Sequence, residues 1–274
     1  MPTAAKKKTI TKKLKPAAAK PEVSKTSTAK SSPTAQDPRS WAEAYVLPPR
    51  MNMMKSRDAF ISSGTRIFAV LEENIKKYKP GKPIQKLDIL EFGCGVGRIA
   101  LPFFHKYGRP SACVDVSQSS IDYLNSVIPG ANPKISVFTP PLPFPDASFD
   151  VIYSISVWTH LEPAKGDLWL ADVARMLRPG GLALISTSSY GQLEKHRQHS
   201  IRGAEWADVS DDDLRREGRI FRDQNYAGMK GAYGCTVHDP DWIKKEWSGL
   251  FDVKDTLVRA VGGHQDLNIL IKKS

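Results

Sequence analysis

The stretch from Leu87 to Arg98, LDILEFGCGVGR, constrains the fold of this chain more than any other. Its apolar first half predicts a short buried strand, and Gly93, Gly95 and Gly97 predict a tight turn after it. The apolar segment from Ile99 to Phe104 then predicts a helix. A strand, a glycine turn and a helix in this order form the type of crevice in which α/β proteins bind nucleotides.

The residues around the glycines exclude two common kinds of nucleotide loop. The dinucleotide fingerprint requires glycine at the sixth position, where this chain has Arg98. The phosphate-binding loop of nucleoside triphosphatases ends in Gly-Lys-Ser or Gly-Lys-Thr, and this turn does not. An acidic residue, Glu91, ends the strand instead. Because opposite charges attract, this carboxylate favours a ligand with a cationic end over a ligand with phosphates.

Three further motifs follow the glycine turn in order. Asp115 ends a second short strand, from Ala112 to Val116, about twenty residues after the glycines. The segment from Leu142 to Asp150, LPFPDASFD, leads into a fourth strand, and ARMLRPGG, from Ala174 to Gly181, precedes a fifth. Together with the glycine turn, these motifs resemble those of the class I S-adenosylmethionine-dependent methyltransferases. The resemblance covers roughly residues 55–272.

The resemblance implies S-adenosylmethionine as the cofactor. The methionine end is expected at Glu91 and the glycine turn, and Asp115 is expected to accept hydrogen bonds from the ribose hydroxyls. Family members often place a carboxylate against the adenine where this chain has Phe138 or Thr139, so backbone groups near Leu142 are expected to bind the adenine edge. The expected cofactor-binding residues are Glu91, Gly93, Cys94, Gly95, Gly97, Asp115, Val116, Leu142 and Ser156.

Apolar strands alternate with amphipathic helices along most of the chain, which predicts a doubly wound parallel sheet. The resemblance implies a Rossmann-like α/β fold with seven strands, mostly parallel, with helices on both faces and an antiparallel last strand, Leu267 to Ile271. A long helix is expected from Ser56 to Tyr78, ahead of the first strand. Its Ser63-Gly64 pair either caps the cofactor or interrupts the helix for packing.

The alternation breaks at about residues 190–239, where a polar and aromatic-rich insertion is expected over the strand ends. This insertion either recognises the methyl acceptor or forms a lid without contact to it. The acidic run from Asp211 to Asp213 is expected to start a helix. The candidates for orienting the acceptor or removing its proton are His160, Tyr190 and His238, with a structural role at a helix start as an equal alternative for His160.

The net charge of +11 is unevenly spread, because residues 1–37 contain nine lysines and only two acidic residues. We expect residues 1–38 to be a disordered Lys/Ala/Pro-rich basic tail, followed by one methyltransferase domain at 39–274. Three interpretations of the tail compete. They are a solubilising segment, an arm that binds nucleic acid or another polyanion, and a targeting signal.

The three cysteines, Cys94, Cys113 and Cys235, have neither the spacing of zinc ligands nor that of a disulfide framework. Reduced thiols and no metal are therefore expected. Since no apolar run approaches the ~20 residues of a spanning helix, we expect a soluble protein without a membrane partner. It would be cytoplasmic, or nuclear in a eukaryote.

Methyl transfer from a sulfonium depends mainly on proximity and alignment, because the donor is already activated. We expect an S-adenosylmethionine-dependent methyltransferase that acts on oxygen or nitrogen of a small molecule. The segment after the fourth strand, from Ser154 to Leu161, lacks the Asn/Asp-Pro-Pro-aromatic and Pro-Cys motifs of base-methylating enzymes, which disfavours direct base methylation. One alternative is a protein or nucleic-acid-associated acceptor delivered by the tail, and another is a cofactor-binding scaffold without turnover.

Overall fold

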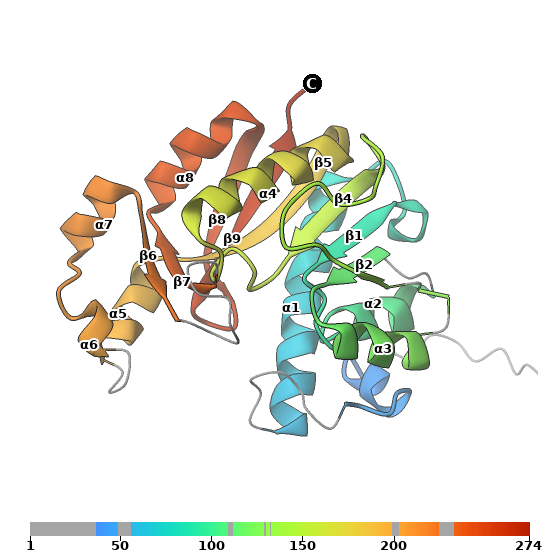
Figure 1. Ribbon diagram of the computed structural model, residues 1–274. Helices are drawn as coiled ribbons and strands as arrows, with labels where there is room; N and C mark the ends of the chain where they lie inside the picture. Colours follow the sequence, from blue (N-terminus) through green and yellow to red (C-terminus); the bar gives the residue numbers. More distant parts are fainter. Residues whose placement is uncertain are drawn as a thin grey trace, which may run out of the picture. The chain divides into compact units, whose positions relative to one another are not determined.

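A mostly parallel sheet runs through the folded part of the chain (Figure 1). The computed structural model describes residues 37–48, 56–108, 112–128, 130–131, 133–198, 203–224 and 233–274. The first five strands lie in the order β3-β2-β1-β4-β5 and are parallel to their neighbours. They are β1 (Ile89–Phe92), β2 (Ala112–Asp115), β3 (Lys134–Ile135), β4 (Phe149–Ser154) and β5 (Leu177–Ser188).

The last two strands complete the sheet beside β5. β9 (Gln265–Lys272) is antiparallel to β5, and β8 (Phe251–Val261) is antiparallel to β9. These seven strands confirm the predicted Rossmann-like α/β class and its antiparallel last strand. The number of strands differs from the seven expected, because the described residues form nine strands. The insertion contributes β6 (Arg219–Asp223) and β7 (Gly234–His238), an antiparallel pair that joins the sheet where β7 meets the end of β5.

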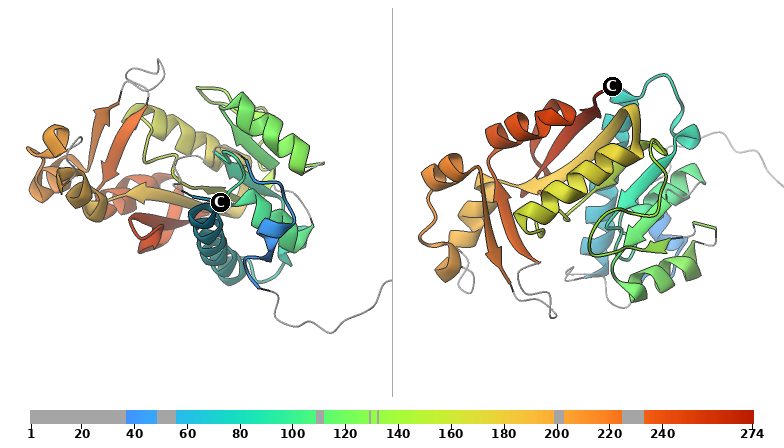
Figure 2. Two further views of the ribbon diagram at one scale, coloured as in Figure 1. Left: turned by 90° about the horizontal axis from the view of Figure 1, so that it is seen from below. Right: turned by 45° about the horizontal axis from the view of Figure 1, so that its top comes forward.

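Helices cover both faces of the sheet, as the views in Figure 2 show for α1 and α4. Neighbouring residues of β4 explain why, since successive side chains of a strand point to opposite faces. Ile152 packs with Val173 of α4, whereas Val151 packs with Leu71 of α1. The helices outside the insertion are η1 (Ser40–Glu43), α1 (Arg57–Tyr78), η2 (Ile84–Lys86), α2 (Ala100–Tyr107), α3 (Gln118–Val127), α4 (Pro163–Met176), α8 (Pro240–Glu246) and η4 (Trp247–Gly249).

Serine side chains cap the first turns of two of these helices, and α1 begins next to Ser56, where the sequence predicts it. Ser56 accepts a hydrogen bond from the Ala59 N–H at 3.1 Å and starts α1. Ser117 accepts one from the Ser120 N–H at 3.3 Å and starts α3. Such caps satisfy backbone donors that have no partner inside the helix.

The insertion has a small core of its own. Its helices are α5 (Tyr190–Gln198), α6 (Gly203–Trp206) and α7 (Asp211–Glu217), and the last of these begins at the acidic run, as predicted. Leu193, Trp206, Leu214 and Val237 pack together in this core. Arg219 of β6 forms a two-pronged ion pair with Asp167 of α4, at 2.6 and 2.7 Å, and ties the insertion to the sheet domain.

Some predictions fall on residues that lie outside the described ones. Residues 1–36 of the expected tail are among them, as are 199–202 and 225–232 of the insertion, so the predictions for these segments stay predictions. Within the described ranges, no helix combines the length and the apolar character needed to cross a membrane. The same ranges hold no group of three His, Cys, Asp or Glu side chains placed to bind a metal ion.

Candidate functional site

The glycine turn after β1 has a backbone conformation that favours glycine at all three positions. Gly93, Gly95 and Gly97 have φ angles of 82°, 51° and 78°, in the left-handed region. The N–H groups of Gly93 and Cys94 both donate to the Val114 carbonyl, at 2.9 and 3.0 Å, which fixes the turn against β2. A Cβ on Gly93 would lie 2.3 Å from Cγ2 of Val157. Glycine at this position therefore allows the turn to pack closely against Val157.

Asp115 lies directly beside this turn. One carboxylate oxygen, Oδ2, accepts the Gly95 N–H at 2.7 Å, and Oδ1 accepts the Ser117 N–H at 2.8 Å. These bonds fix the carboxylate at the carboxyl end of β2, between the turn and the start of α3. Because each carboxylate oxygen has two lone pairs, the group can still accept hydrogen bonds from a diol such as ribose.

Glu91 is a buried carboxylate at the end of β1. Its Oε2 accepts a hydrogen bond from the Tyr153 hydroxyl at 3.0 Å. Burial raises the pKa of Glu91 to about 8, and the hydrogen bond from Tyr153 and the nearby charge of Arg98 offset this only in part. An ionised carboxylate in this place would be stabilised by a cationic ligand group, so the site suits an ammonium or a sulfonium.

Helix α1 packs on the glycine turn at Arg98. The Arg98 guanidinium donates to the Ser63 hydroxyl at 3.1 Å. A Cβ on Gly64 would lie 2.3 Å from the Arg98 carbonyl oxygen and 3.3 Å from Cζ2 of Trp41. Glycine at this position allows the helix to approach the turn, which favours the packing interpretation of the Ser63-Gly64 pair.

Apolar side chains lie exposed at the ends of β2 and β3. Val116 is 47% exposed, Val137 44% and Phe138 62%. The two strand ends adjoin each other, because the Ser136 N–H donates to the Asp115 carbonyl at 2.8 Å. Exposed apolar side chains beside a polar crevice are suited to a flat aromatic ring of a ligand.

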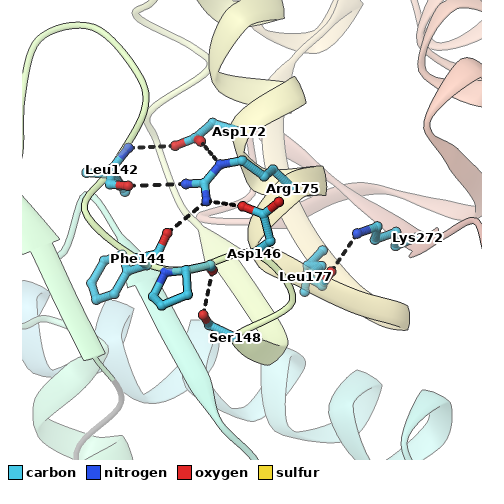
Figure 3. Close-up of polar contacts among 9 residues, drawn as sticks. Leu142, Phe144, Asp146, Ser148, Asp172, Arg175, Leu177 and Lys272 are labelled. Carbon is cyan, nitrogen blue, oxygen red and sulfur yellow. Dashed lines mark hydrogen bonds and ion pairs between the residues drawn. The ribbon is translucent and has the colours of Figure 1, made fainter.

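The backbone of Leu142, near which the adenine edge is expected to bind, is bonded to α4. Its side chain is buried, its N–H donates to Asp172 at 2.8 Å, and its carbonyl accepts from Arg175 at 3.1 Å (Figure 3). The N–H group is thus already bonded and does not favour binding of an adenine edge by Leu142. The exposed segment before it, which includes Phe138, is better placed.

Ser156 lies at the end of β4 in a network that joins three strands. Its φ of 63° is in the left-handed region, which is uncommon for serine. Its N–H donates to the Ser186 hydroxyl at 2.7 Å, and its own hydroxyl donates to Gln265 at 3.1 Å. Ser186 also donates to Gln265, at 2.9 Å. These contacts hold the end of β4 in an unusual backbone conformation, a feature that clusters at functional sites.

His160 follows β4 and contacts the insertion. Its Nδ1 lies 2.8 Å from the Gly234 carbonyl, and its ring stacks on Tyr233 with centroids 4.7 Å apart and planes 8° apart. A carbonyl oxygen can only accept, so Nδ1 carries a proton and donates this bond. The bond and the stacking fix the orientation of the imidazole.

The other two acceptor-side candidates lie in different surroundings. The Tyr190 hydroxyl donates to Asp239, and burial together with this carboxylate raises the Tyr190 pKa. His238 is buried beside Trp242 and Trp247, and burial lowers its pKa to about 3. A histidine with so low a pKa is a weak proton acceptor, so this placement does not support a catalytic role for His238.

Cys94 faces the core rather than a ligand. Its thiol is buried and hydrogen-bonded to that of Cys113, and this bond and burial raise the Cys94 pKa well above its ordinary range. A cofactor in the crevice can therefore contact Cys94 through its backbone but not through its thiol. The thiolate form, which reacts with electrophiles and metals, is strongly disfavoured here.

Sequence reasoning missed several residues that the structure brings to the site. Arg98 had a usable signal, as a charged residue inside an apolar stretch directly after the turn. Ser186 and Gln265 carried no comparable signal, because they lie in separate strands and meet Ser156 only in the folded chain.

The fold is that of an α/β protein with a glycine turn and two carboxylates at the carboxyl ends of neighbouring strands. Residues 90–185 match a family model described as a methyltransferase domain. The segment from β1 to β5 is thus similar to a methyltransferase domain.

Two solved structures have a similar fold. The PH0226 protein from Pyrococcus horikoshii OT3 is 19% identical and has a TM-score of 0.56, covering 84% of this chain and 99% of that protein. An S-adenosylmethionine-dependent methyltransferase from Methanosarcina mazei is 18% identical with a TM-score of 0.51, covering 73% of this chain and 96% of that one. Both support the fold alone.

Curated relatives match over shorter segments. The tRNA N(3)-cytidine methyltransferase METTL2 of Gallus gallus is 26% identical over 155 residues, which is 53% of this chain and 40% of that protein. The O-methyltransferase resE of Aspergillus sclerotiorum is 33% identical over 103 residues, 36% of this chain and 38% of that protein. The matched segments thus span less than half the length of either relative.

Proposed function

We propose that this protein is an S-adenosylmethionine-dependent methyltransferase that acts on an oxygen or nitrogen nucleophile. The observation that carries the proposal is the placement of the left-handed glycine turn, Asp115 and Glu91 at the carboxyl ends of two neighbouring strands. S-adenosylmethionine, when bound, supplies a methyl group on a sulfonium that is activated for displacement.

Each part of the crevice suits one part of this cofactor. Glu91 balances the positive charge of the methionine end, and the Arg98 guanidinium binds its carboxylate. Asp115 accepts hydrogen bonds from the ribose hydroxyls. Val116 and Phe138 cover the adenine ring with apolar surface. The bare backbone of the glycine turn allows the cofactor to lie close to β1.

On the acceptor side, His160 is the residue best placed to handle a proton. The bond from Nδ1 to the Gly234 carbonyl leaves Nε2 as the basic atom, which takes the proton that a hydroxyl or amine acceptor loses on methylation. His160→Asn is expected to lower kcat with little change in cofactor affinity. An equal loss of cofactor affinity would instead assign the residue a structural role.

The acceptor is proposed to be a small molecule, which the match to an O-methyltransferase supports. A second candidate is a tRNA acceptor, which the match to METTL2 and the nine lysines at the start of the chain favour. Transfer of a labelled methyl group should be measured on a panel of phenols and amines and on tRNA, with the full chain and a chain lacking residues 1–36.

The outcomes separate the candidates. Turnover of a small acceptor by both chains supports the first. Turnover of tRNA that collapses without residues 1–36, and that falls steeply with salt, supports the second. Cofactor binding without turnover of any acceptor would favour a cofactor-binding scaffold instead.

A further inference from the structure

The segment after β3 is held at both ends and exposed in between. At its start, the Ser136 N–H donates to the Asp115 carbonyl at 2.8 Å. At its far end, the Leu142 N–H donates to Asp172 Oδ2 at 2.8 Å. Residues 137–141 span these two anchors, and we call them the arch. The arch contains Phe138, the most exposed aromatic side chain beside the candidate cofactor crevice.

Two residues of α4 make the far anchor. Arg175 donates through Nη2 to the Leu142 carbonyl at 3.1 Å and through Nη1 to the Phe144 carbonyl at 2.8 Å (Figure 3). Its Nε donates to Asp172 Oδ1 at 2.7 Å, so each oxygen of Asp172 has a partner. Asp146 accepts a further bond from Arg175 Nη1 at 2.7 Å. We call Asp172 and Arg175 the clamp.

The clamp binds backbone groups of the loop rather than side chains of the sheet. Because the Asp172 side chain is 3% exposed, its charge requires the partners that it has. The planar guanidinium directs its N–H groups in a fixed fork, which a lysine ammonium does not reproduce. The position of the loop at Leu142 and Phe144 is therefore set by the geometry of two α4 side chains.

The near anchor connects the same arch to the backbone of Asp115, whose carboxylate is the proposed ribose ligand. β2 and β3 pair with Asp115 opposite Ile135, so the first arch residues leave the sheet next to Asp115 and Val116. Any shift of the arch therefore changes the apolar wall that Val116, Val137 and Phe138 present beside that carboxylate.

We propose that Asp172 and Arg175 are positioning residues for the adenine of the cofactor, because they hold the arch so that Phe138 and Val137 form one wall of the adenine pocket. The proposal rests on the proposed function, since it concerns the same cofactor. Neither clamp residue touches the cofactor, and both act through the backbone of the loop.

The test uses two clamp variants and one matched control in the full chain. Arg175→Lys keeps the charge and loses the fork. Asp172→Asn can keep only one of the two Asp172 contacts, and it covers the case that Arg175→Lys does not fold. The control is Lys272→Met. This change removes the 2.7 Å hydrogen bond that Lys272 Nζ donates to the Leu177 carbonyl, at the start of β5 (Figure 3).

Binding of S-adenosylhomocysteine and of S-inosylhomocysteine should be measured by calorimetry, and thermal unfolding should be recorded for every variant. The clamp variants are expected to lower the affinity for S-adenosylhomocysteine about tenfold. They should also reduce the difference in affinity between the adenine and the hypoxanthine ligand. At saturating S-adenosylmethionine, kcat should be unchanged. The control should bind both ligands as the wild type does, even if its unfolding midpoint falls as far as those of the clamp variants.

Two results would overturn the proposal, and they differ in what they imply. If the wild type binds S-adenosylhomocysteine and the clamp variants bind it equally well with unchanged discrimination, the clamp is only structural and the proposed function stands. If the wild type binds neither ligand, the proposed function fails and the clamp proposal fails with it.

Discussion

The glycine turn and the insertion are held in place by different kinds of contact. At the turn, backbone groups make the contacts, as when Gly93 and Cys94 donate to the Val114 carbonyl. In the insertion, side chains far apart in sequence make them, as in the pairs Tyr190–Asp239 and Arg219–Asp167. A backbone conformation that favours glycine tolerates few substitutions, whereas an ion pair with an exposed partner, such as Asp167, contributes little to stability. The cofactor side should therefore be sensitive to single changes and the acceptor side robust, which the following variants test.

Gly93→Ala should have the largest effect. The new Cβ would meet Cγ2 of Val157 at 2.3 Å, in a backbone conformation that L residues rarely adopt. We expect binding of S-adenosylhomocysteine to fall below detection, with a loss of at least ~2 kcal/mol in the free energy of unfolding. Gly108→Ala is the control, because Gly108 also has a positive φ, of 63°, but no atom lies within 4 Å of the added Cβ. If the two variants bind the ligand equally well, the close packing of the turn is irrelevant to binding.

Asp115→Ala should lower the affinity for S-adenosylhomocysteine about a hundredfold while the protein stays folded. The reason is the loss of two charge-assisted hydrogen bonds to the ribose. Asp122→Ala is the matched control, as Asp122 accepts a hydrogen bond from Gln118 within α3 and has no place in the crevice. Calorimetry measures the affinities, and circular dichroism checks the fold. Unchanged affinity of the Asp115 variant would exclude the ribose assignment.

The buried carboxylate of Glu91 should make cofactor binding dependent on pH. Its pKa of about 8 means that the ligand-free protein holds a proton there at neutral pH, whereas a cationic ligand favours the ionised form. Affinity should therefore rise about tenfold per pH unit between about pH 6 and 8 and then level off, with release of a proton on binding.

The stability of the ligand-free protein should change in the opposite direction. Since folding raises the pKa of Glu91, the unfolded chain loses this proton at lower pH than the folded one, and stability falls as the pH rises from about 5 to 8. Glu91→Gln should remove both dependences. Affinity that is independent of pH in the wild type would show that the ligand does not interact with this carboxylate.

Asp167→Asn should have the smallest effect. It breaks the pair with Arg219 that joins α4 to the insertion, and Asp167 is 51% exposed, so the free energy of unfolding should fall by no more than about 1 kcal/mol. Acceptor KM is expected to rise a few-fold while cofactor affinity stays constant. Asp212→Asn, which breaks an exposed pair with Arg215 inside α7, is the control. A large loss of cofactor affinity in Asp167→Asn would contradict the division between the two sides.

The same division explains how much could be predicted from the sequence. The turn and Asp115 were identifiable because glycines with positive φ and carboxylates at strand ends leave local patterns. The mostly parallel sheet and its antiparallel last strand followed from the alternation and the family resemblance. β6 and β7 could not be predicted, because they join the sheet through contacts with β5 and with the segment after β4, which are distant in sequence.

Two expected residues have contacts that local patterns do not predict. Leu142 lies in a recognisable motif, but its N–H and carbonyl are bonded to Asp172 and Arg175, about thirty residues later in the chain. His238 was selected for its residue type, yet its burial by Trp242 and Trp247 lowers its pKa. Neither contact is encoded in the surrounding sequence.

The measurement that tests the central claim most directly is a calorimetric titration of S-adenosylhomocysteine into the intact protein at pH 6, 7 and 8. The account predicts one site per chain with micromolar affinity, an affinity that increases with pH, and release of a proton that disappears in Glu91→Gln. Absence of binding at all three pH values would contradict the assignment of the crevice between β1 and β2 as the cofactor site.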